Sequence, residues 1–188
     1  MRQLLLDFTQ APAPSFANFV PGGNAELLHA LTAAARGEAP ERVIYVWGER
    51  GAGKTHLAKA LDSATAGMPG IRVIDEVEQL GDAEQVELFD AFNERAFRFL
   101  LVTARSAPRD VALRRDLATR LATGLTYRVL PLTDDEKRAA LAAHAKSRGF
   151  ALSEEVSSYL LTHARRDMAC LLVVRARPLS RGIPPGVL

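Results

Sequence analysis

The stretch GERGAGKT, residues 48–55, constrains the fold more than any other part of this sequence. It has the complete pattern G-x-x-x-x-G-K-T, which forms a phosphate-binding loop when a strand precedes it and a helix follows it. The run RVIYVWG before it is rich in β-branched and aromatic residues and predicts a buried strand over Val43–Trp47. The residues after it predict a helix from Lys54 to Ala64. Both neighbours match the pattern, so we expect a nucleotide-binding loop here rather than a chance run of glycines.

The chemistry of such a loop follows from its residue types. Glycines let successive backbone N–H groups curl around phosphate oxygens, and the N-terminus of the following helix adds partial positive charge. The side chain of Lys54 is expected to reach the β- and γ-phosphates, and the hydroxyl of Thr55 is expected to bind Mg²⁺. The predicted nucleotide-binding residues of this stretch are Gly48, Glu49, Arg50, Gly51, Ala52, Gly53, Lys54, Thr55 and His56.

A second buried strand, IRVID, is followed by a glutamate, so that two acids stand where the strand ends. A carboxylate beside a phosphate loop is a suitable Mg²⁺ ligand, mostly through water, and we assign this role to Asp75. Glu76 is placed to polarise an attacking water as a catalytic base. The alternative is that both carboxylates only solvate the end of the strand.

Two further strands are predicted, FRFLLVTA and LTYRVLPL, the second of which is stopped by Pro131. The first of them ends at Thr103, whose hydroxyl either hydrogen-bonds an attacking water or merely closes the strand. Because helices alternate with the strands, the fold class is α/β, with a mostly parallel sheet of four strands between helices. Only 21 positions separate Lys54 from Asp75, too few for a further strand and helix. The second strand is therefore expected at a sheet edge, which suits its Arg72.

Composition limits the alternatives for the whole chain. With 188 residues, 48% of them apolar, one compact domain and a small appendage are expected. The formal net charge of +2 does not favour bulk nucleic-acid binding. A single cysteine excludes an intramolecular disulfide and a cysteine-based metal cluster, and the four scattered histidines offer little to a zinc ion. No apolar run is long enough for a membrane span or a signal peptide, so we expect a cytoplasmic protein without a membrane partner.

Helix signals and prolines divide the chain into four parts. Helix N-caps are expected at Asn24, Thr133 and Ser153, and from Thr133 onward the pattern is helical only, with RRDMACLLVV as the third helix. The last part holds three prolines and two glycines and predicts a disordered tail. The expected parts are an apolar peptide with a Pro/Ala spacer over residues 1–14, the nucleotide-binding domain over 15–131, a small all-helical C-terminal lid over 132–174 and the tail over 175–188.

The opening peptide MRQLLLDF is unusual because four large apolar side chains stand at a terminus, where chains are commonly frayed and wet. Two interpretations fit the residues alone. The peptide is either a short strand that folds back onto the protein or a segment offered to a partner.

Taken together, these features resemble the AAA+ ATPases and, within them, the DnaA-related group of Hda-like regulators. The resembling segments cover most of residues 15–172 in the order of the family. They are SFANFVPGGNAEL, VWGERGAGKTHL, LLVTARSAPRDV, DLATRLATGLTYRVLPLTDDEK and HARRDMACLL. The resemblance stops at about Val174, where the family continues its lid and this chain has a basic, proline-rich stretch instead.

The resemblance implies a partner for the opening peptide. QLLLDF looks like the peptide with which Hda-like and many other replication proteins dock on the DNA polymerase sliding clamp. An amide and alternate apolar anchors on a flexible segment suit a surface groove. The clamp-binding residues implied are Gln3, Leu4, Leu6 and Phe8, and the Pro/Ala spacer would hold them clear of the domain.

The resemblance also implies roles for four residues of the domain and lid. Arg120 falls at the arginine finger, which one protomer inserts toward the γ-phosphate held by a neighbour; the alternative is an ordinary arginine on a helix surface. Arg166 falls at the lid arginine that touches the bound nucleotide. Phe19 and Val20 match the segment that packs around the adenine, with ordinary core packing as the alternative.

The function implied is negative regulation of DNA replication initiation. The chain would carry ADP or ATP with Mg²⁺, meet DNA indirectly through the clamp, and use Arg120 to promote hydrolysis of the ATP bound to the initiator DnaA. In this scheme its own ATP turnover is open and could be negligible. The alternatives are an autonomous AAA+ ATPase or helicase loader with Glu76 as base, and a non-catalytic clamp-binding adaptor.

Overall fold

A computed structural model describes residues 5–8, 13–147, 153–163 and 174–177 of the chain. The chain divides into two compact units, one formed by residues 13–136 and the other by residues 1–12 and 137–188. The first unit contains the phosphate loop and is built around a sheet. The second contains the region for which the sequence predicts a lid.

The sheet of the first unit has four strands in the order β3-β4-β2-β5, and all neighbouring strands are parallel. This confirms the predicted α/β fold and the edge position of the strand that ends in Asp75. The edge strand is half-buried, and its Arg72 bonds Glu87 at 3.1 Å on the surface. The elements in chain order are η1 Phe16–Asn18, η2 Gly22–Asn24, α1 Ala25–Ala35, β2 Val43–Trp47, α2 Lys54–Ala64, β3 Ile71–Ile74, η3 Val77–Gln79, α3 Asp82–Asn93, β4 Phe99–Ala104, α4 Arg115–Leu121 and β5 Leu125–Arg128.

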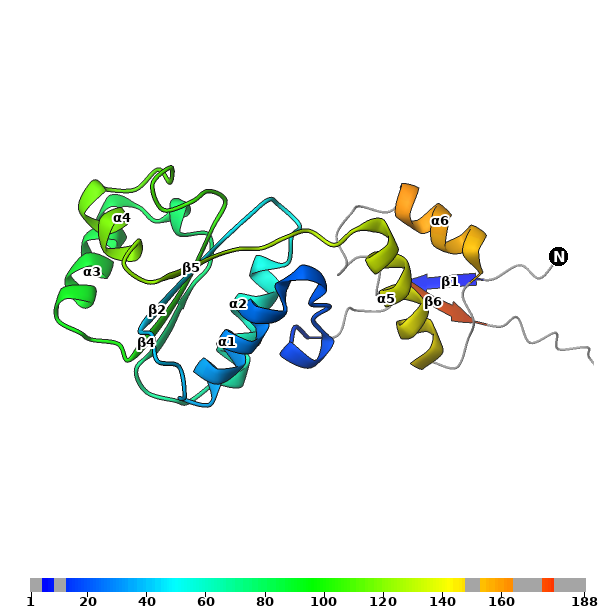
Figure 1. Cartoon of the computed structure of the whole chain (residues 1–188), viewed down its shortest axis with the longest axis horizontal. Coiled ribbons are helices and arrows are strands. Elements are labelled where there is room, and N and C mark those ends of the chain that lie inside the picture. Colours follow the sequence, from blue (N-terminus) through cyan, green and yellow to red (C-terminus); the bar gives the residue numbers. More distant parts are fainter. Residues whose placement is uncertain (1–4, 9–12, 148–152, 164–173, 178–188) are drawn as a thin grey trace, which may run out of the picture. The chain divides into compact units, whose positions relative to one another are not determined.

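Helices cover both faces of this sheet (Figure 1). Alternate residues of β2 and β4 point to opposite sides, as the period of a strand requires. Tyr45 and Val102 pack with buried leucines of α3 and α4, whereas Ile44 and Leu101 pack with those of α1 and α2. The two central strands are therefore buried on both faces, which explains why their sequences are continuous apolar runs.

The ends of two helices test the predicted caps. Asn24 occupies the N-cap position of α1, but its side chain makes no capping hydrogen bond there. Its amide instead bonds the backbone of Leu130 in both directions, donating to the carbonyl at 2.9 Å and accepting from the N–H at 2.8 Å. The predicted N-cap position is therefore confirmed, although the side chain of Asn24 bonds a distant partner instead of the first turn of the helix. Thr133 does form a capping box with Glu136, as predicted.

The second unit contains two helices and a strand pair. α5 spans Asp134–Ser147, crossing the division between the units, and α6 spans Glu154–His163. Ser153 caps α6 as predicted, accepting a hydrogen bond from the N–H of Val156 at 3.4 Å. Leu141 and Ala145, one turn apart on α5, are buried.

The strand pair of this unit joins the two ends of the chain. β1, Leu5–Phe8, runs antiparallel to β6, Val174–Arg177, with Leu5 opposite Arg177 and Phe8 opposite Val174. The sequence predicts helix up to residue 174 and a disordered tail from residue 175, so β6 was not predicted and the tail prediction is wrong for residues 175–177. Pairing with β1 gives backbone groups of this segment partners that no neighbouring residues supply. The predicted third helix lies outside the described residues except for its last residue, and so does the tail after residue 177.

Candidate nucleotide site

The loop GERGAGKT connects β2 to α2, in the context that the sequence predicts. Gly53 is the N-cap of α2 and has a φ of 105°, in the left-handed region that disfavours residues with a Cβ. A Cβ at this position would also lie 3.0 Å from the ring of Phe19. Backbone geometry and close packing therefore both require glycine at this position.

Lys54 lies inside the loop with only 7% of its surface exposed. Its ammonium group donates hydrogen bonds to the carbonyls of Gly48 at 2.7 Å and Glu49 at 2.9 Å. Burial lowers the pKa of Lys54, and the negative charges of Glu78, Asp75 and Glu76 oppose this shift. The structure thus places the predicted acidic pair close enough to the predicted phosphate-binding lysine for their charges to interact.

Thr103 is fully buried at the end of β4, and its hydroxyl connects two strand ends. It donates to Asp75 Oδ1 at 2.5 Å and accepts from the N–H of Glu76 at 2.9 Å. The hydroxyl proton is therefore committed to Asp75 in this structure. Thr103 fixes the turn that presents both acids, and its contact with an attacking water stays a prediction.

Glu76 begins the short helix η3 with a φ of 52°, a conformation that costs about 1–3 kcal/mol for a non-glycine residue. Its Oε1 accepts from Arg105 at 3.2 Å, and its Oε2 accepts from the amide of Gln79. Both oxygens of the predicted base are thus hydrogen-bonded by the chain itself.

The sequence reasoning missed two charged residues of this site, Arg105 and Glu78. Glu78 Oε1 accepts from the backbone N–H of Arg105 at 3.1 Å and lies 3.5 Å from its Nε. Its Oε2 is buried and has no hydrogen-bond partner among the described residues. The sequence could have indicated Arg105, because this residue directly follows β4 and the carboxyl ends of parallel strands meet at one edge of a sheet.

Tyr45 is a buried residue of β2 that bonds the segment following β4. Its hydroxyl donates to the carbonyl of Ser106 at 3.0 Å. Burial raises the pKa of Tyr45, and the nearby charge of Glu78 raises it further. The phenol therefore stays protonated and anchors the segment that follows β4.

The predicted adenine-side residues lie beside the loop. The centroids of the Phe19 and His56 rings are 5.5 Å apart and the rings are tilted by 52°, and the Phe19 ring lies where a side chain at position 53 would crowd it. His56 Nε2 lies 3.0 Å from the carbonyl of Ser15, which connects the segment before α1 to α2. Phe19 is packed against the core, while Val20 is half-buried. The structure thus brings together the two rings and the loop, and adenine contact stays a prediction.

The residues present fit Mg²⁺. Thr55 and Asp75 are both exposed and offer hard oxygen ligands, and Oδ2 of Asp75 has no hydrogen-bond partner in the described part of the chain. Mg²⁺ commonly takes one or two protein oxygens and completes its shell with phosphates and water. No group of three or more His, Cys, Asp or Glu residues that could hold a metal occurs within the described ranges. The fit is therefore to a nucleotide-bound cation rather than to an independent metal centre.

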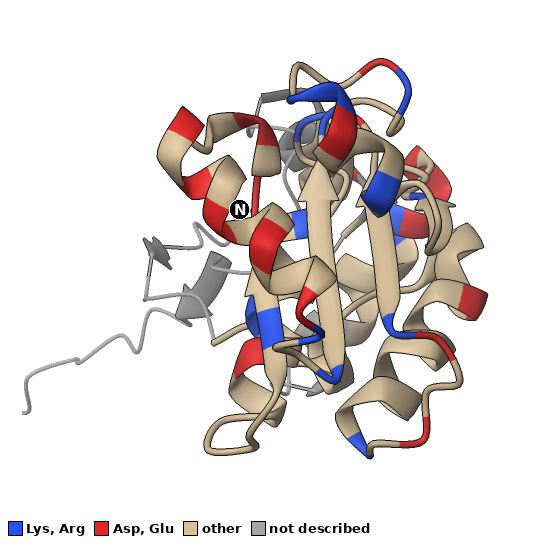
Figure 2. Cartoon of the chain, turned by 90° about the vertical axis from the view of Figure 1, so that its left-hand side faces the viewer, with Lys and Arg blue, Asp and Glu red and all other residues tan. Residues whose placement is uncertain are grey.

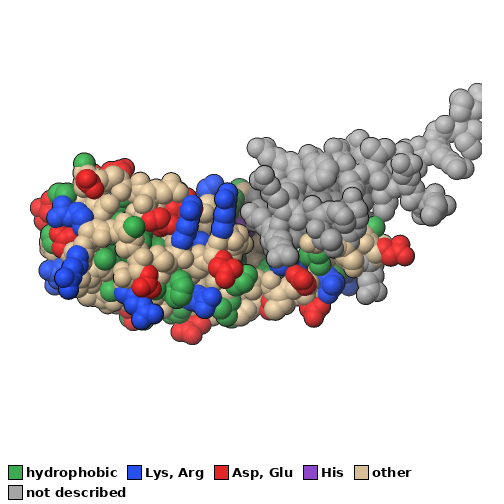
Figure 3. All heavy atoms as spheres, turned by 90° about the horizontal axis from the view of Figure 1, so that it is seen from above, with side chains coloured by type: hydrophobic (Ala, Val, Ile, Leu, Met, Phe, Trp, Pro, Cys, Tyr) green, Lys and Arg blue, Asp and Glu red, His purple; other side chains and the backbone are tan. Residues whose placement is uncertain are grey.

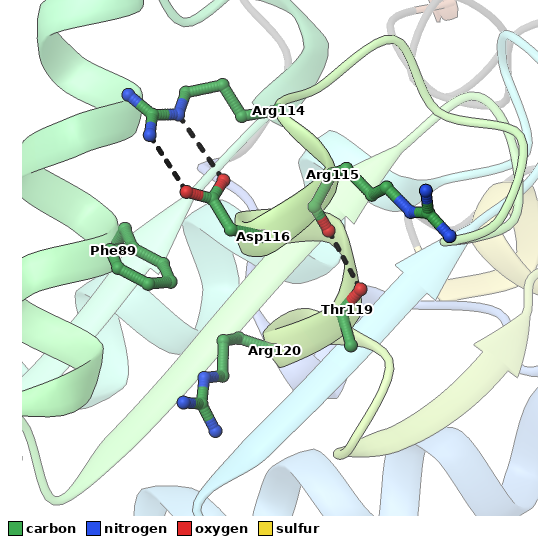
Figure 4. A pocket seen from close by; sticks show the side chains of 6 residues that line it. All are labelled: Phe89, Arg114, Arg115, Asp116, Thr119 and Arg120. Carbon is green, nitrogen blue, oxygen red and sulfur yellow. Dashed lines mark hydrogen bonds and ion pairs between the residues drawn. The ribbon is translucent and has the colours of Figure 1, made fainter.

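Arg120 lies on α4 and lines a pocket of about 710 Å³, none of whose lining residues belongs to the loop 48–55 (Figure 4). Arg114 in the same pocket is paired with Asp116 at 2.8 Å. The exposed guanidinium groups of Arg115 and Arg120, by contrast, have no hydrogen bond or ion pair to any described residue. Figure 4 shows Arg120 pointing away from the Arg114–Asp116 pair. The remaining residues that line the pocket are Phe89 and Thr119.

Several predicted residues cannot be compared with geometry. Gln3, Leu4 and Arg166 lie outside the described residues. Leu6 and Phe8 lie in β1, where the backbone pairs with β6. The clamp-binding and lid-arginine assignments therefore stay predictions.

The described surface carries both signs of charge. Acidic and basic residues both occur on the side that carries α3 and α4 (Figure 2), and Figure 3 shows both kinds on the face seen from above. This agrees with the small net charge of +2. None of the described helices is long and apolar enough to cross a membrane.

The chain is similar in structure to replication initiators. Domain III of the replication initiation protein DnaA from Thermotoga maritima superimposes with a TM-score of 0.71 at 19% identity, over 87% of this chain and 86% of that one. AMPPCP-bound DnaA from Aquifex aeolicus gives 0.68 at 19% identity, over 85% of this chain and 63% of that one. A RuvB variant from Thermotoga maritima gives 0.61 at 19% identity, over 87% and 62%. With the phosphate loop at the end of a parallel sheet, this likeness defines a protein with the AAA+ fold.

Within that class, residues 134–176 match the family model described as the Hda lid domain. This match and the shared fold agree with the resemblance of the sequence motifs to the DnaA-related group of Hda-like proteins. It spans 63% of the length of the AMPPCP-bound DnaA chain.

Proposed function

We propose that this chain is a negative regulator of replication initiation that promotes hydrolysis of ATP bound to DnaA. The observation that carries the proposal is the state of Arg120. It is exposed in a pocket that also holds the paired Arg114, yet it has no partner among the described residues. An arginine finger acts on a nucleotide held by another protein, so it needs to be unpaired until that protein arrives. The match of residues 134–176 to the Hda lid domain also supports this proposal.

The chain's own nucleotide is proposed to be ADP or ATP. Lys54 would bind the phosphates from its position inside the loop, and the backbone N–H groups of Gly51 and Gly53 would donate to phosphate oxygens. Thr55 and Asp75 would hold Mg²⁺, which neutralises phosphate charge when it is bound. That AMPPCP is bound by DnaA, a protein of the same fold, is in line with this site.

The opening peptide is proposed to tether the chain to the sliding clamp through Gln3, Leu4, Leu6 and Phe8. A tether raises the local concentration of the chain near DNA without a strong direct contact. The pairing of β1 with β6 requires that Leu5–Phe8 leave β6 or dock through the side of the strand that β6 does not use.

The test is hydrolysis of radiolabelled ATP bound to purified DnaA, with clamp loaded on DNA. The chain and its Arg120→Ala variant are added in parallel, with Arg109→Ala as a matched control. Arg109 is also an exposed arginine, but its partner is its neighbour Asp110 at 3.3 Å. Stimulation by the chain and by Arg109→Ala, but not by Arg120→Ala, would support the proposal.

Two other results would replace the proposal. Equal stimulation by all three proteins would favour an adaptor that recruits DnaA without a catalytic arginine. No stimulation by any of them, together with rapid ATP turnover by the chain alone, would favour an autonomous ATPase with Glu76 as base.

A further inference from the structure

We infer that Arg105 is a positioning residue that holds the carboxylate of Glu76 in an ion pair, so that the chain keeps its bound nucleotide instead of hydrolysing it. The inference rests on the proposed nucleotide site. It goes beyond the proposed function because it explains why the chain's own turnover would be low and names the residue responsible.

The first observation is that the chain itself occupies the carboxylate of Glu76. Arg105 donates to Oε1 at 3.2 Å, and the amide of Gln79 donates to Oε2. A general base must accept a proton from a water placed within hydrogen-bond reach of it. With one donor on each oxygen, the carboxylate is oriented by Arg105 and Gln79, and two of its acceptor sites are already used.

The second observation is that Arg105 is anchored. Its backbone N–H bonds Glu78 at 3.1 Å, and its Nε lies 3.5 Å from the same carboxylate. The next residue, Ser106, is fixed through its carbonyl by the hydroxyl of the buried Tyr45 at 3.0 Å. Arg105 thus bridges Glu76 and Glu78 from a segment that is tied to the central strand β2.

The third observation concerns the other polar groups at the strand ends. The proton of the Thr103 hydroxyl is donated to Asp75 at 2.5 Å, so this hydroxyl does not donate to a water either. Both oxygens of Glu76 and the proton of the Thr103 hydroxyl are thus engaged by neighbouring residues. Lys54 and the exposed side of Asp75 remain for phosphate and Mg²⁺. The arrangement supports binding more than hydrolysis.

The experiment compares the full-length chain with Arg105→Ala in two assays. Binding of a fluorescent ADP analogue gives the nucleotide affinity, and single-turnover hydrolysis of bound ATP gives the rate of chemistry. We expect the affinity to change less than about threefold, while the hydrolysis rate rises at least ~10-fold, since general base catalysis is worth ~10²–10⁴-fold. Arg109→Ala, in the same segment, should change neither quantity.

Three further variants test the mechanism. Adding Glu76→Gln to Arg105→Ala should abolish the gain, because the released base is then absent. Arg105→Lys should restore slow hydrolysis in part, because it keeps the charge and loses the fork that spans two carboxylates. Gln79→Ala frees the other oxygen of Glu76 and should also raise the rate. It provides an independent test if Arg105→Ala lowers the melting temperature through the uncompensated charge of Glu78.

The outcomes separate this inference from the proposal on which it rests. Failure of the unmodified chain to bind the ADP analogue would overturn the proposed nucleotide site. Tight binding with no rise in hydrolysis in either Arg105→Ala or Gln79→Ala would overturn the role of Arg105 alone. A rise that survives Glu76→Gln would overturn it as well.

Discussion

The phosphate-loop end of the sheet and the α3–α4 face differ in how their charges are satisfied. At the loop end, the side chains of Lys54, Asp75, Glu76 and Arg105 each bond another described group. On the α3–α4 face, Arg115 and Arg120 are exposed and have no partner among the described residues. Leaving a charge unpaired at the surface costs little, because water solvates it. In the proposed function, the first region holds the chain's own nucleotide and the second meets another protein.

The largest effect is expected at Arg120. Arg120→Lys should lose nearly all the stimulation of DnaA-bound ATP hydrolysis, a loss of ~10³-fold, because lysine lacks the planar fork that stabilises transition-state charge. Radiolabelled nucleotide on DnaA measures the rate. Because Arg120 is exposed and unpaired, the melting temperature and the affinity for the ADP analogue should stay unchanged. A change in either would contradict the proposal that Arg120 acts on the nucleotide of DnaA and not on the chain's own site.

The next effect is expected at Lys54. Lys54→Ala should weaken binding of the ADP analogue by ~10–100-fold, because charged hydrogen bonds to phosphate are lost and each is worth about 1.5–3 kcal/mol. Fluorescence titration measures the affinity. Lys59→Ala, one turn further along the same helix, is the control and should bind as the unmodified chain does. Equal affinity of Lys54→Ala and the unmodified chain would show that the loop does not hold phosphate.

A smaller effect, on stability, is expected at Thr103. Thr103→Val keeps the shape but leaves the N–H of Glu76 without its acceptor, so the free energy of unfolding should fall by about 1–3 kcal/mol. Denaturant unfolding measures it. The control is Thr119→Val on α4, where the exposed hydroxyl bonds only the carbonyl of Arg115 in its own helix. Similar losses in both variants would remove the contrast between the two regions.

The smallest effect is expected at the Arg114–Asp116 pair of the α3–α4 face. The hydrogen bond from Arg114 holds the pKa of Asp116 below its usual value, so the pair stabilises the folded state above the pKa of an unfolded aspartate. This contribution disappears as the pH falls through the lowered pKa of Asp116. Because both groups are exposed, Arg114→Gln should barely change the melting temperature at neutral pH. A large drop at pH 7 would mean that this pair is buried by a partner copy in solution.

Local signals determined most of the fold. The G-x-x-x-x-G-K-T stretch after Val43–Trp47 set the strand, loop and helix, because each depends on residues adjacent in sequence. The edge position of β3 followed from the short span between Lys54 and Asp75. Thr133 was found for the same reason, since a capping box is complete within four residues.

Contacts between distant residues were not readable in this way. Asn24 has the residue type of a cap, but the backbone of Leu130, 106 residues away, takes its side chain. The same holds for β1 and β6, whose pairing joins the two ends of the described chain.

For this protein, the sequence by itself determined the fold class and the conformation of the predicted phosphate loop, because such a loop is a local structure with few compatible residues. Only the tertiary structure decided which charges are paired. It placed Arg105 on Glu76 and Glu78 across two strands, and it left Arg120 without a partner on α4. Pairing depends on where the ends of β3 and β4 meet in space, and no spacing along the chain encodes that.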